Sequence, residues 1–339
     1  MIIDRHTPYK FKNGLVMKNR VIVPPMASRT ADESGFVTDQ TIEHYKRLGR
    51  SNAGLIFVEY SYIHQTGKGE ANQLGAGSNA HIPGLKQIAS IIHQTSAVAG
   101  LQLVHVGGKT STDLTRTPLM GPSATPVPVK DRALDTPVPM TEAQIQNWQE
   151  WFVEAVGRAV AADFDFVELH AAHGYGLNQW LSPLTNKRTD SFGGTIEGRS
   201  RLLLRIATKI KATYPKILLS VRLPAQDYLD GGLTVSEMAW VVSQLESIGV
   251  DLIDVSSGIG GWRRPEGSFG QGYLVADATQ LKTQTAVPVM GVGGIETGEF
   301  IDEILRNAHV DFAAVGRAIL QDPESWGRKN LNLLPDNVS

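Results

Sequence analysis

The chain has 339 residues, of which 42% are hydrophobic and 19% charged, and its formal net charge is −2 at pH 7. Because the net charge is small and no lysine- and arginine-rich run occurs, we expect neither nucleic acid nor an anionic membrane as a partner. The sequence has no cysteine, which excludes disulfides, thiolate nucleophiles, iron–sulfur clusters and cysteine-ligated zinc. The first ten residues carry charges and no apolar core, so we expect a cytoplasmic protein without a signal peptide or a membrane span.

Short apolar runs recur along the chain and predict eight strands. Most of these runs are apolar throughout instead of alternating, which is typical of parallel strands covered on both faces. They comprise residues 21–23, 54–60, 100–105, 164–170, 217–223, 251–256, 288–292 and 311–315.

Helical patterns fill the intervals between these strands. In residues 141–161 apolar side chains recur at helical spacing behind a capping box of Thr141 and Gln144. Residues 234–248 show the same pattern and begin with the capping-box residues Thr234 and Glu237. Further helices are expected at residues 38–51, 83–95, 196–213, 275–285 and 297–307.

The regular alternation of strand and helix predicts a parallel sheet with right-handed crossovers. Eight such units favour a closed (β/α)8 TIM barrel, and the absence of a linker or composition shift predicts a single domain over residues 1–339. Three connections are long, at residues 106–140, 171–195 and 257–274. Each follows a strand and should rise from the carboxyl face of the barrel, where barrel enzymes place their active sites.

Two histidines and a tyrosine stand where the strand at residues 164–170 ends. His170 closes the strand, and His173 and Tyr175 follow in a glycine-broken loop. Further metal ligands are missing there, so no metal site is expected. The arrangement instead suits hydrogen-bond donors directed at an oxygen atom of a ligand.

Glycines follow the last two predicted strands. Gly293 and Gly294 come after the seventh, and Gly316 with Arg317 after the eighth. In barrels these two loops often bind phosphate through backbone N–H groups and a helix N-terminus, and Arg317 could add a charge-assisted contact. The alternative is that the glycines only allow close packing of helix on strand.

The motif from residue 170 to residue 194 resembles the old yellow enzymes, which are FMN-dependent ene-reductases built on a barrel. The resemblance covers residues 8 to about 325, and the short loops and the His-x-x-His pair are similar to the thermophilic-like bacterial subgroup. Within this motif the matching stretches are residues 170–175, 181–186, 188–190 and 192–194, and outside it they are residues 15–20, 81–85, 101–105, 316–317 and 322–323.

The resemblance implies noncovalent FMN, with NADPH or NADH as the reductant. Arg222 would face the N1–O2 edge of the flavin, where a fixed cation stabilises the negative charge that appears on reduction; its alternative role is a pair with Asp227 or Glu168. Gln102 would hydrogen-bond the pyrimidine side. The phosphate would be held by Gly293, Gly294, Gly316 and Arg317, and the ring by Pro24, Pro25, Met26 and Ala27, with Tyr60 also at the cofactor.

The catalytic roles that the resemblance implies are specific. His170 and His173 would donate hydrogen bonds to the oxygen of an α,β-unsaturated carbonyl or nitro compound, so that its β-carbon accepts hydride from flavin N5. Tyr175 would then give a proton to the α-carbon. The expected partner is therefore a small activated alkene.

This sequence departs from the subgroup at several positions. Ala27 stands in place of a cysteine beside the flavin, and Arg29, at a substrate-binding position, in place of a tyrosine. Tyr60 replaces a small residue, and Gly108 replaces an arginine beside Lys109. A cation at position 29 would favour substrates with an acidic group. The chain ends without the arginine that some relatives insert into a neighbour's site, which leaves homo-oligomer formation open.

Other readings of the sequence remain. One is a different FMN-barrel dehydrogenase or a dienoyl-CoA-type reductase lacking the iron–sulfur module. Another is a phosphate-binding barrel lyase or isomerase without flavin, for which Lys109 would be the candidate lysine. A binding barrel without catalysis is the third.

Overall fold

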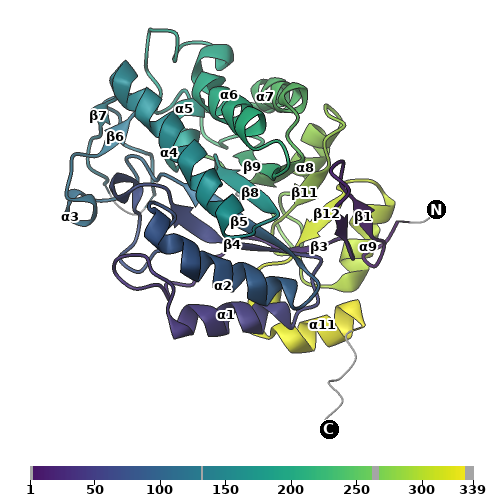
Figure 1. Cartoon of the computed structure of the whole chain (residues 1–339). Coiled ribbons are helices and arrows are strands. Elements are labelled where there is room, and N and C mark those ends of the chain that lie inside the picture. The colour runs from purple at the N-terminus through teal and green to yellow at the C-terminus, as the bar shows by residue number, and fades with distance from the viewer. Residues whose placement is uncertain (1–2, 131–132, 262–266, 333–339) are drawn as a thin grey trace.

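The structure is a computed structural model, and it describes residues 3–130, 133–261 and 267–332. Eight parallel strands close into a barrel and the helices surround it (Figure 1), which confirms the predicted (β/α)8 fold. All eight predicted strands are barrel strands. In spatial order they are β3 (Val21–Val23), β4 (Leu55–Tyr62), β5 (Val98–Val104), β8 (Phe166–His170), β9 (Leu218–Pro224), β10 (Leu252–Ser256), β11 (Val289–Gly291) and β12 (Phe312–Ala314).

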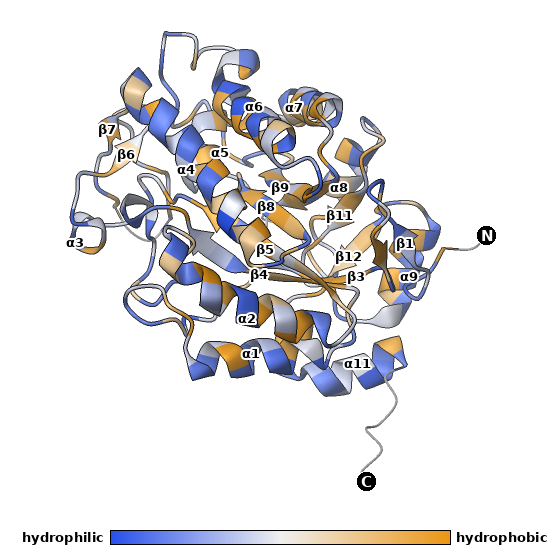
Figure 2. Cartoon of the chain, viewed as in Figure 1, coloured by the Kyte–Doolittle hydropathy of each residue, from blue (hydrophilic) through white to orange (hydrophobic). Residues whose placement is uncertain are grey.

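The seven predicted helices are also present, and both predicted capping boxes form. Thr141 accepts a hydrogen bond from the backbone of Gln144, and Thr234 from that of Glu237. Figure 2 shows that the helices mix hydrophilic and hydrophobic residues, as expected of helices with one face on the strands and one in water. They are α1 (Asp39–Gly49), α2 (Ile82–His93), α4 (Glu142–Ala161), α6 (Ile196–Thr213), α7 (Val235–Ile248), α8 (Val275–Lys282) and α9 (Gly298–Arg306).

Several short elements lie outside the repeated pattern and were not predicted. On the carboxyl face they are η1 (Gln65–Gly67), η2 (Asn79–His81), α3 (Thr112–Thr115), β6 (Met120–Gly121), β7 (Val138–Pro139) and α5 (Gly176–Leu181). The N-terminal strands β1 (Tyr9–Lys10) and β2 (Val16–Met17) form an antiparallel hairpin, and α10 (Arg317–Gln321) and α11 (Pro323–Leu331) follow β12.

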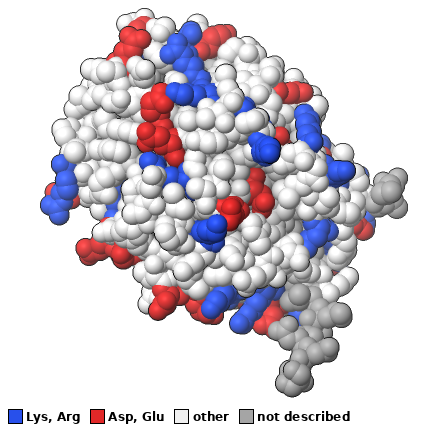
Figure 3. All heavy atoms as spheres, viewed as in Figure 1, with Lys and Arg blue, Asp and Glu red and all other residues white. Residues whose placement is uncertain are grey.

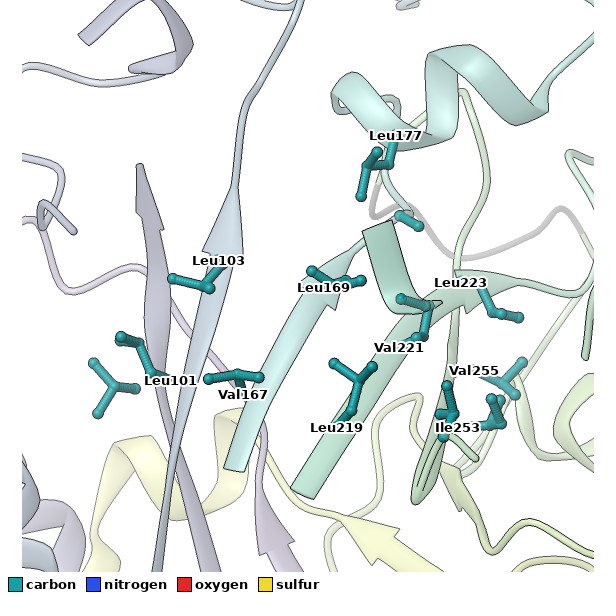
Figure 4. Packing of buried hydrophobic residues seen from close by; sticks show 14 of the residues in the cluster. Leu101, Leu103, Val167, Leu169, Leu177, Leu219, Val221, Leu223, Ile253 and Val255 are labelled. Atoms are coloured by element: carbon teal, nitrogen blue, oxygen red, sulfur yellow. The ribbon is translucent and has the colours of Figure 1, made fainter. Parts of the chain in front are cut away.

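Side chains alternate between two apolar cores. The residues that face outward from the barrel strands form one core with apolar residues of the helices, and Figure 4 shows Leu101, Val167 and Leu219 among them on neighbouring strands. The residues that face inward at the amino ends of the strands form a second core, with Phe57, Phe166, Leu218, Leu252, Met290 and Phe312 among its members. Because side chains alternate along each strand with a period of two, each strand contributes residues to both cores.

The N-terminal hairpin closes the amino end of the barrel. Phe11 is 4% exposed and its ring lies 5.0 Å from that of Phe166 and 6.0 Å from that of Phe312. Met17 joins the same inner core. In Figure 1 the hairpin lies beside β12, and the ring of Tyr9 contacts Phe312 at 5.0 Å. The barrel interior is thus sealed on the side away from the long loops.

Within the described residues, no helix is both long and apolar enough to cross a bilayer. On the face shown in Figure 3, lysine and arginine lie interspersed with aspartate and glutamate.

The aromatic seal yields a stability prediction. Phe11→Ala removes a ring that contacts two strands of the inner core, so we expect a loss of about 3–5 kcal/mol of unfolding free energy. Urea denaturation would measure it. Val16→Ala is the matched control, because Val16 lies in the same hairpin but is 55% exposed, and it should change stability by less than about 0.5 kcal/mol. Equal effects of the two substitutions would show that the hairpin does not seal the core.

Candidate active site

The structure brings the three predicted residues of the β8 loop together at the carboxyl face. The imidazole rings of His170 and His173 lie 5.0 Å apart between centroids. The ring of Tyr175 lies 4.8 Å from that of His170 and 6.5 Å from that of His173. Two imidazoles and a phenol therefore surround one small region above the barrel.

A tight turn aims these side chains. His173 and Gly174 both have left-handed backbones, with φ of 61° and 73°. The first turn of α5 holds them, since Asn178 Oδ1 accepts from the Gly174 N–H at 2.8 Å and Gln179 Nε2 donates to the Gly174 carbonyl at 2.8 Å. Tyr175 is the residue that precedes α5. Helix α5, which the sequence did not predict, therefore fixes the position of Tyr175.

Each imidazole uses one ring nitrogen within the protein. His170 Nδ1 accepts from the Ala172 N–H at 3.3 Å, which places the ring proton on Nε2. His173 Nε2 lies 2.7 Å from Ser256 Oγ, and the serine hydroxyl can donate to it. The second nitrogen of each ring has no hydrogen-bond partner in the described part of the chain. Each ring can therefore offer one N–H to a ligand.

Both histidines are neutral. Burial lowers the pKa of His170 well below its usual range, and the neighbouring His173 ring and the positive charges of Arg222 and Lys109 lower it further. For His173, desolvation again dominates the downward pKa shift, followed by Arg222 and Lys109. The two rings are thus neutral hydrogen-bond donors rather than cations.

Two further side chains frame Tyr175. The ring of Tyr60 is stacked on it at 5.5 Å between centroids and 21° between planes. The Lys109 ammonium lies 5.0 Å from its ring centroid and also donates to the His173 carbonyl. Tyr60 itself is 7% exposed, and burial, together with Tyr175 and Glu70, raises its pKa. The site is therefore bounded on this side by a second phenol and a cation.

Arg29 lies at the outer rim with a left-handed backbone, φ 58°. Its guanidinium makes a bidentate contact with Glu70, at 2.6 Å and 3.0 Å. The Arg29 charge is thus matched by a carboxylate, a partner that the sequence did not predict.

Below the histidines, the barrel interior holds buried polar groups. Arg222 is 5% exposed and its Nε lies 2.6 Å from Asp254 Oδ2. This corrects the alternative that paired Arg222 with Asp227 or Glu168. Asp227 instead accepts from Ser182 Oγ and two backbone N–H groups, and Glu168 accepts from Gln102 Nε2 at 2.9 Å.

The buried guanidinium of Arg222 has N–H donors that are not used within the described residues. A ligand whose ring carries hydrogen-bond acceptors requires such donors. Arginine carries five N–H donors, and Asp254 is the single partner of Arg222 in residues 3–130, 133–261 and 267–332. Gln102 has given its amide N–H to Glu168, so its Oε1 is left without a partner among the described residues. These two side chains therefore fit the polar edge of a flavin.

The loops after β11, β12 and β3 converge at the carboxyl face. Gly293 and Gly294 have φ of 118° and 66°. A Cβ at Gly294 would lie 3.5 Å from Arg317 Nη2, and one at Gly316 would lie 3.2 Å from Met26 Sδ. Arg317 is exposed and has no ion pair within the described residues. Glycine N–H groups and an unpaired guanidinium thus lie close together, as a phosphate requires.

The loop after β3 is anchored from below. Pro24 and Pro25 are buried, whereas Ala27 is exposed. The Ser28 N–H donates to Glu59 Oε2 at 3.0 Å, and Glu59 is 1% exposed. The backbone of this loop is thereby presented to the carboxyl face.

Two important residues of this region, Glu168 and Asp254, were not predicted as site residues. Each interrupts an otherwise apolar strand, and an isolated carboxylate is costly to bury. That interruption is the sequence signal that could have identified them. Among the described residues, no group of three or more histidine, aspartate or glutamate side chains could hold a metal ion.

The comparison with known proteins decides the family. Residues 6–336 match the NADH:flavin oxidoreductase / NADH oxidase family. The chain belongs to this family. It is an oxidoreductase of the old yellow enzyme type, a family that binds FMN and uses NAD(P)H as its reductant. The predictions of family, cofactor and reductant are confirmed.

Individual relatives support the same conclusion. The chain is 36% identical over 317 residues to the NADPH dehydrogenase of Halalkalibacterium halodurans, covering 93% of this chain and 90% of that protein. It is 36% identical over 338 residues to the NADH oxidase of Thermoanaerobacter brockii, covering 96% of this chain but 51% of the relative. The chain thus spans about half the length of the latter.

A solved structure confirms the fold. The old yellow enzyme homologue from Zymomonas mobilis superposes with a TM-score of 0.83 at 23% sequence identity, and the match covers 96% of this chain and 92% of that one.

The neutral histidines predict how stability depends on pH. Because their pKa values lie below the usual 6.5 in the folded protein, the unfolded chain binds more protons below about pH 6.5. Stability should therefore fall as the pH drops below that value, by up to about 1.4 kcal/mol per pH unit for each histidine. His170→Asn with His173→Asn should flatten this slope in urea denaturation. His6→Asn, an exposed histidine, is the control, and an unchanged slope in the double variant would contradict the assignment.

Proposed function

We propose that the protein is an ene-reductase that reduces the activated double bond of an α,β-unsaturated carbonyl or nitro compound. The observation that carries the proposal is the convergence of His170, His173 and Tyr175, in which each imidazole keeps one ring nitrogen for a ligand. Two neutral donors beside a phenol suit a substrate whose oxygen gains charge while a carbon gains a proton.

The cofactor would be held by three groups of residues. Arg222 and Gln102 would bind the polar edge of the flavin, since both keep unused hydrogen-bonding atoms. When bound, FMN supplies the hydride that it has received from NADPH or NADH. Tyr60 would bound the ring pocket on the side of Tyr175. The remaining contacts are the loop of Pro24, Pro25, Met26 and Ala27 for the ring, and Gly293, Gly294, Gly316 and Arg317 for the phosphate.

His170 and His173 would activate the substrate. Their free N–H groups would donate to its carbonyl or nitro oxygen and stabilise the charge that develops there. A preorganised donor of this kind is typically worth about 2.7–4 kcal/mol in the transition state. Because both rings are neutral, they can do so without losing a proton to the substrate.

Tyr175 would supply the proton to the α-carbon. Lys109 favours this role, because its ammonium lies 5.0 Å from the ring centroid of Tyr175 and a nearby cation stabilises the phenolate that remains. Lys109 also binds the His173 carbonyl, so the same side chain links the proton donor to the histidine turn.

Arg29 would contact the substrate at the rim. Its bidentate pair with Glu70 means that an acidic substrate must compete with that carboxylate. An acidic substrate would therefore bind Arg29 only by displacing Glu70, and Arg29 would not act as an unpaired positive charge.

Arg317 tests the phosphate assignment. Arg317→Ala removes a charged hydrogen-bond donor and should weaken FMN binding by about 1.5–3 kcal/mol, roughly ten- to a hundredfold in Kd. Fluorescence titration of the apoprotein with FMN would measure it. Arg328→Ala is the control, because Arg328 on α11 pairs with Glu324 instead. An unchanged Kd in Arg317→Ala would show that the phosphate binds elsewhere.

Tyr175 tests the ene-reductase proposal itself. Tyr175→Phe should leave the reduction of bound FMN by NADPH nearly unchanged and slow the reduction of cyclohexenone, which needs the proton. It should matter less for a nitroalkene, because the nitronate is stable enough to be protonated by water. Stopped-flow measurement of the two half-reactions separates these effects.

The matched control for this experiment is Tyr228→Phe, whose hydroxyl contacts Asp277 rather than the histidines. Should Tyr175→Phe slow both half-reactions equally, or leave cyclohexenone reduction at the parent rate, Tyr175 is not the proton donor.

A further inference from the structure

Two acidic side chains and one basic side chain lie buried on the adjacent strands β8, β9 and β10. The side chains of Glu168 on β8 and Asp254 on β10 are completely buried, and Arg222 on β9 is 5% exposed. The guanidinium lies 2.6 Å from Asp254. Glu168 makes no ion pair within the described residues. A single cation therefore serves two buried carboxyl groups.

The neighbours of Glu168 are uncharged on both flanking strands. The register aligns Glu168 with Gln102 on β5 and with Ser220 on β9. Gln102 Nε2 donates to Glu168 Oε1 at 2.9 Å, and Ser220 Oγ lies 2.7 Å from Oε2. The second contact joins two oxygens, so its proton can equally belong to the carboxyl group.

Energetics favour one charge rather than two. Burying an ionised carboxylate costs several kcal/mol unless a cation compensates it, and like charges that share a site are not both ionised. Asp254 has the direct contact with Arg222, so it keeps the charge. Burial, with the charge of Asp254, raises the pKa of Glu168 to about 8, whereas that of Asp254 rises to about 6.

We propose that Glu168 is a neutral carboxylic acid at neutral pH and acts as a positioning residue for the cofactor site. Its carbonyl oxygen Oε1 accepts from Gln102 and turns the Gln102 oxygen toward the site. Its acidic proton lies on Oε2 toward Ser220. Asp254 alone then counterbalances Arg222. The effect on the cofactor rests on the proposed function, in which Gln102 and Arg222 hold the flavin.

The proton on Glu168 sets the charge beneath the cofactor. With Glu168 neutral, the three groups Arg222, Asp254 and Glu168 sum to zero, and with Glu168 ionised they sum to one negative charge. Reduced flavin carries added negative charge, so it holds the Glu168 proton more tightly than oxidised flavin does. The reduction potential should therefore fall more steeply with pH near the pKa of Glu168. The other titratable groups near Glu168 do not supply this slope, since the pKa of Asp254 is about 6 and that of His170 lies well below its usual range.

Infrared spectroscopy of the apoprotein tests the protonation state without flavin. At neutral pH, Glu168→Gln should remove the absorption of one protonated carboxyl group. Asp190→Asn is the control, because the Arg188 guanidinium holds the pKa of the Asp190 carboxyl below its usual value, and it should remove a carboxylate band instead. Loss of a carboxylate band in Glu168→Gln would overturn the proposal. If that variant does not fold, titration of the protonated band in the parent apoprotein decides, and its absence at neutral pH overturns the proposal.

The potential of the holoenzyme tests the consequence. Asp254→Asn removes the charge that helps to raise the pKa of Glu168, so Glu168 should become the counter-ion of Arg222 at a lower pH and the steeper fall of the potential should move below pH 8. Glu168→Gln should leave the neutral-pH potential near that of the parent and abolish the steeper fall above about pH 8. A higher potential in Glu168→Gln than in the parent at neutral pH would show that Glu168 is charged and would overturn the proposal. Failure of all variants and of the parent to bind FMN would count against the proposed function, while the infrared result would still decide the state of Glu168.

Discussion

Everything in this protein depends on the alternation of side chains along strands that close into a barrel. Because successive residues point to opposite sides, a shift of one residue would turn the functional side chains of the strands outward, beneath the helices. Three adjacent strands show the inward series from the sealed end to the carboxyl face: Phe166, Glu168 and His170 on β8; Leu218, Ser220 and Arg222 on β9; Leu252, Asp254 and Ser256 on β10. An apolar layer thus supports a layer of buried charge, which supports the site.

The repeated part of this architecture could be predicted from the sequence because its signal is local. Apolar runs mark the strands, and capping boxes such as Thr141 with Gln144 mark the helix starts. The N-terminal hairpin could not be predicted in this way, since its strands have two residues each and show no period. The hairpin contributes to the inner core through the contacts of Phe11 with strands that lie far along the chain. Helix α5 is similarly too short for a helical pattern.

For the site, too, residues with a local sequence signal could be predicted, whereas contacts between distant residues could not. His170, His173 and Tyr175 could be predicted because they lie together in the sequence after a strand, and the structure brings their rings within 6.5 Å of one another. Their partners could not, because they come from other strands and loops. Arg222 faces Asp254 through the register of β9 with β10. Glu70 contacts Arg29 because of the path of a loop. The sequence does not show that path, so the ion pair could be found only in the folded structure.

The placement of charge explains why the two site histidines are neutral. Arg222 below and Lys109 beside them supply fixed positive charge, and both lower the pKa of the imidazoles beyond the effect of burial. A third and a fourth cation would have to be desolvated without a counter-ion, since Asp254 already serves Arg222. The positive field around the ligand therefore comes from Arg222 and Lys109, while the two imidazoles that would donate to the ligand are neutral. Because the pKa of each imidazole lies well below its usual range, the number of hydrogen bonds that the rings offer to a substrate oxygen does not change near neutral pH.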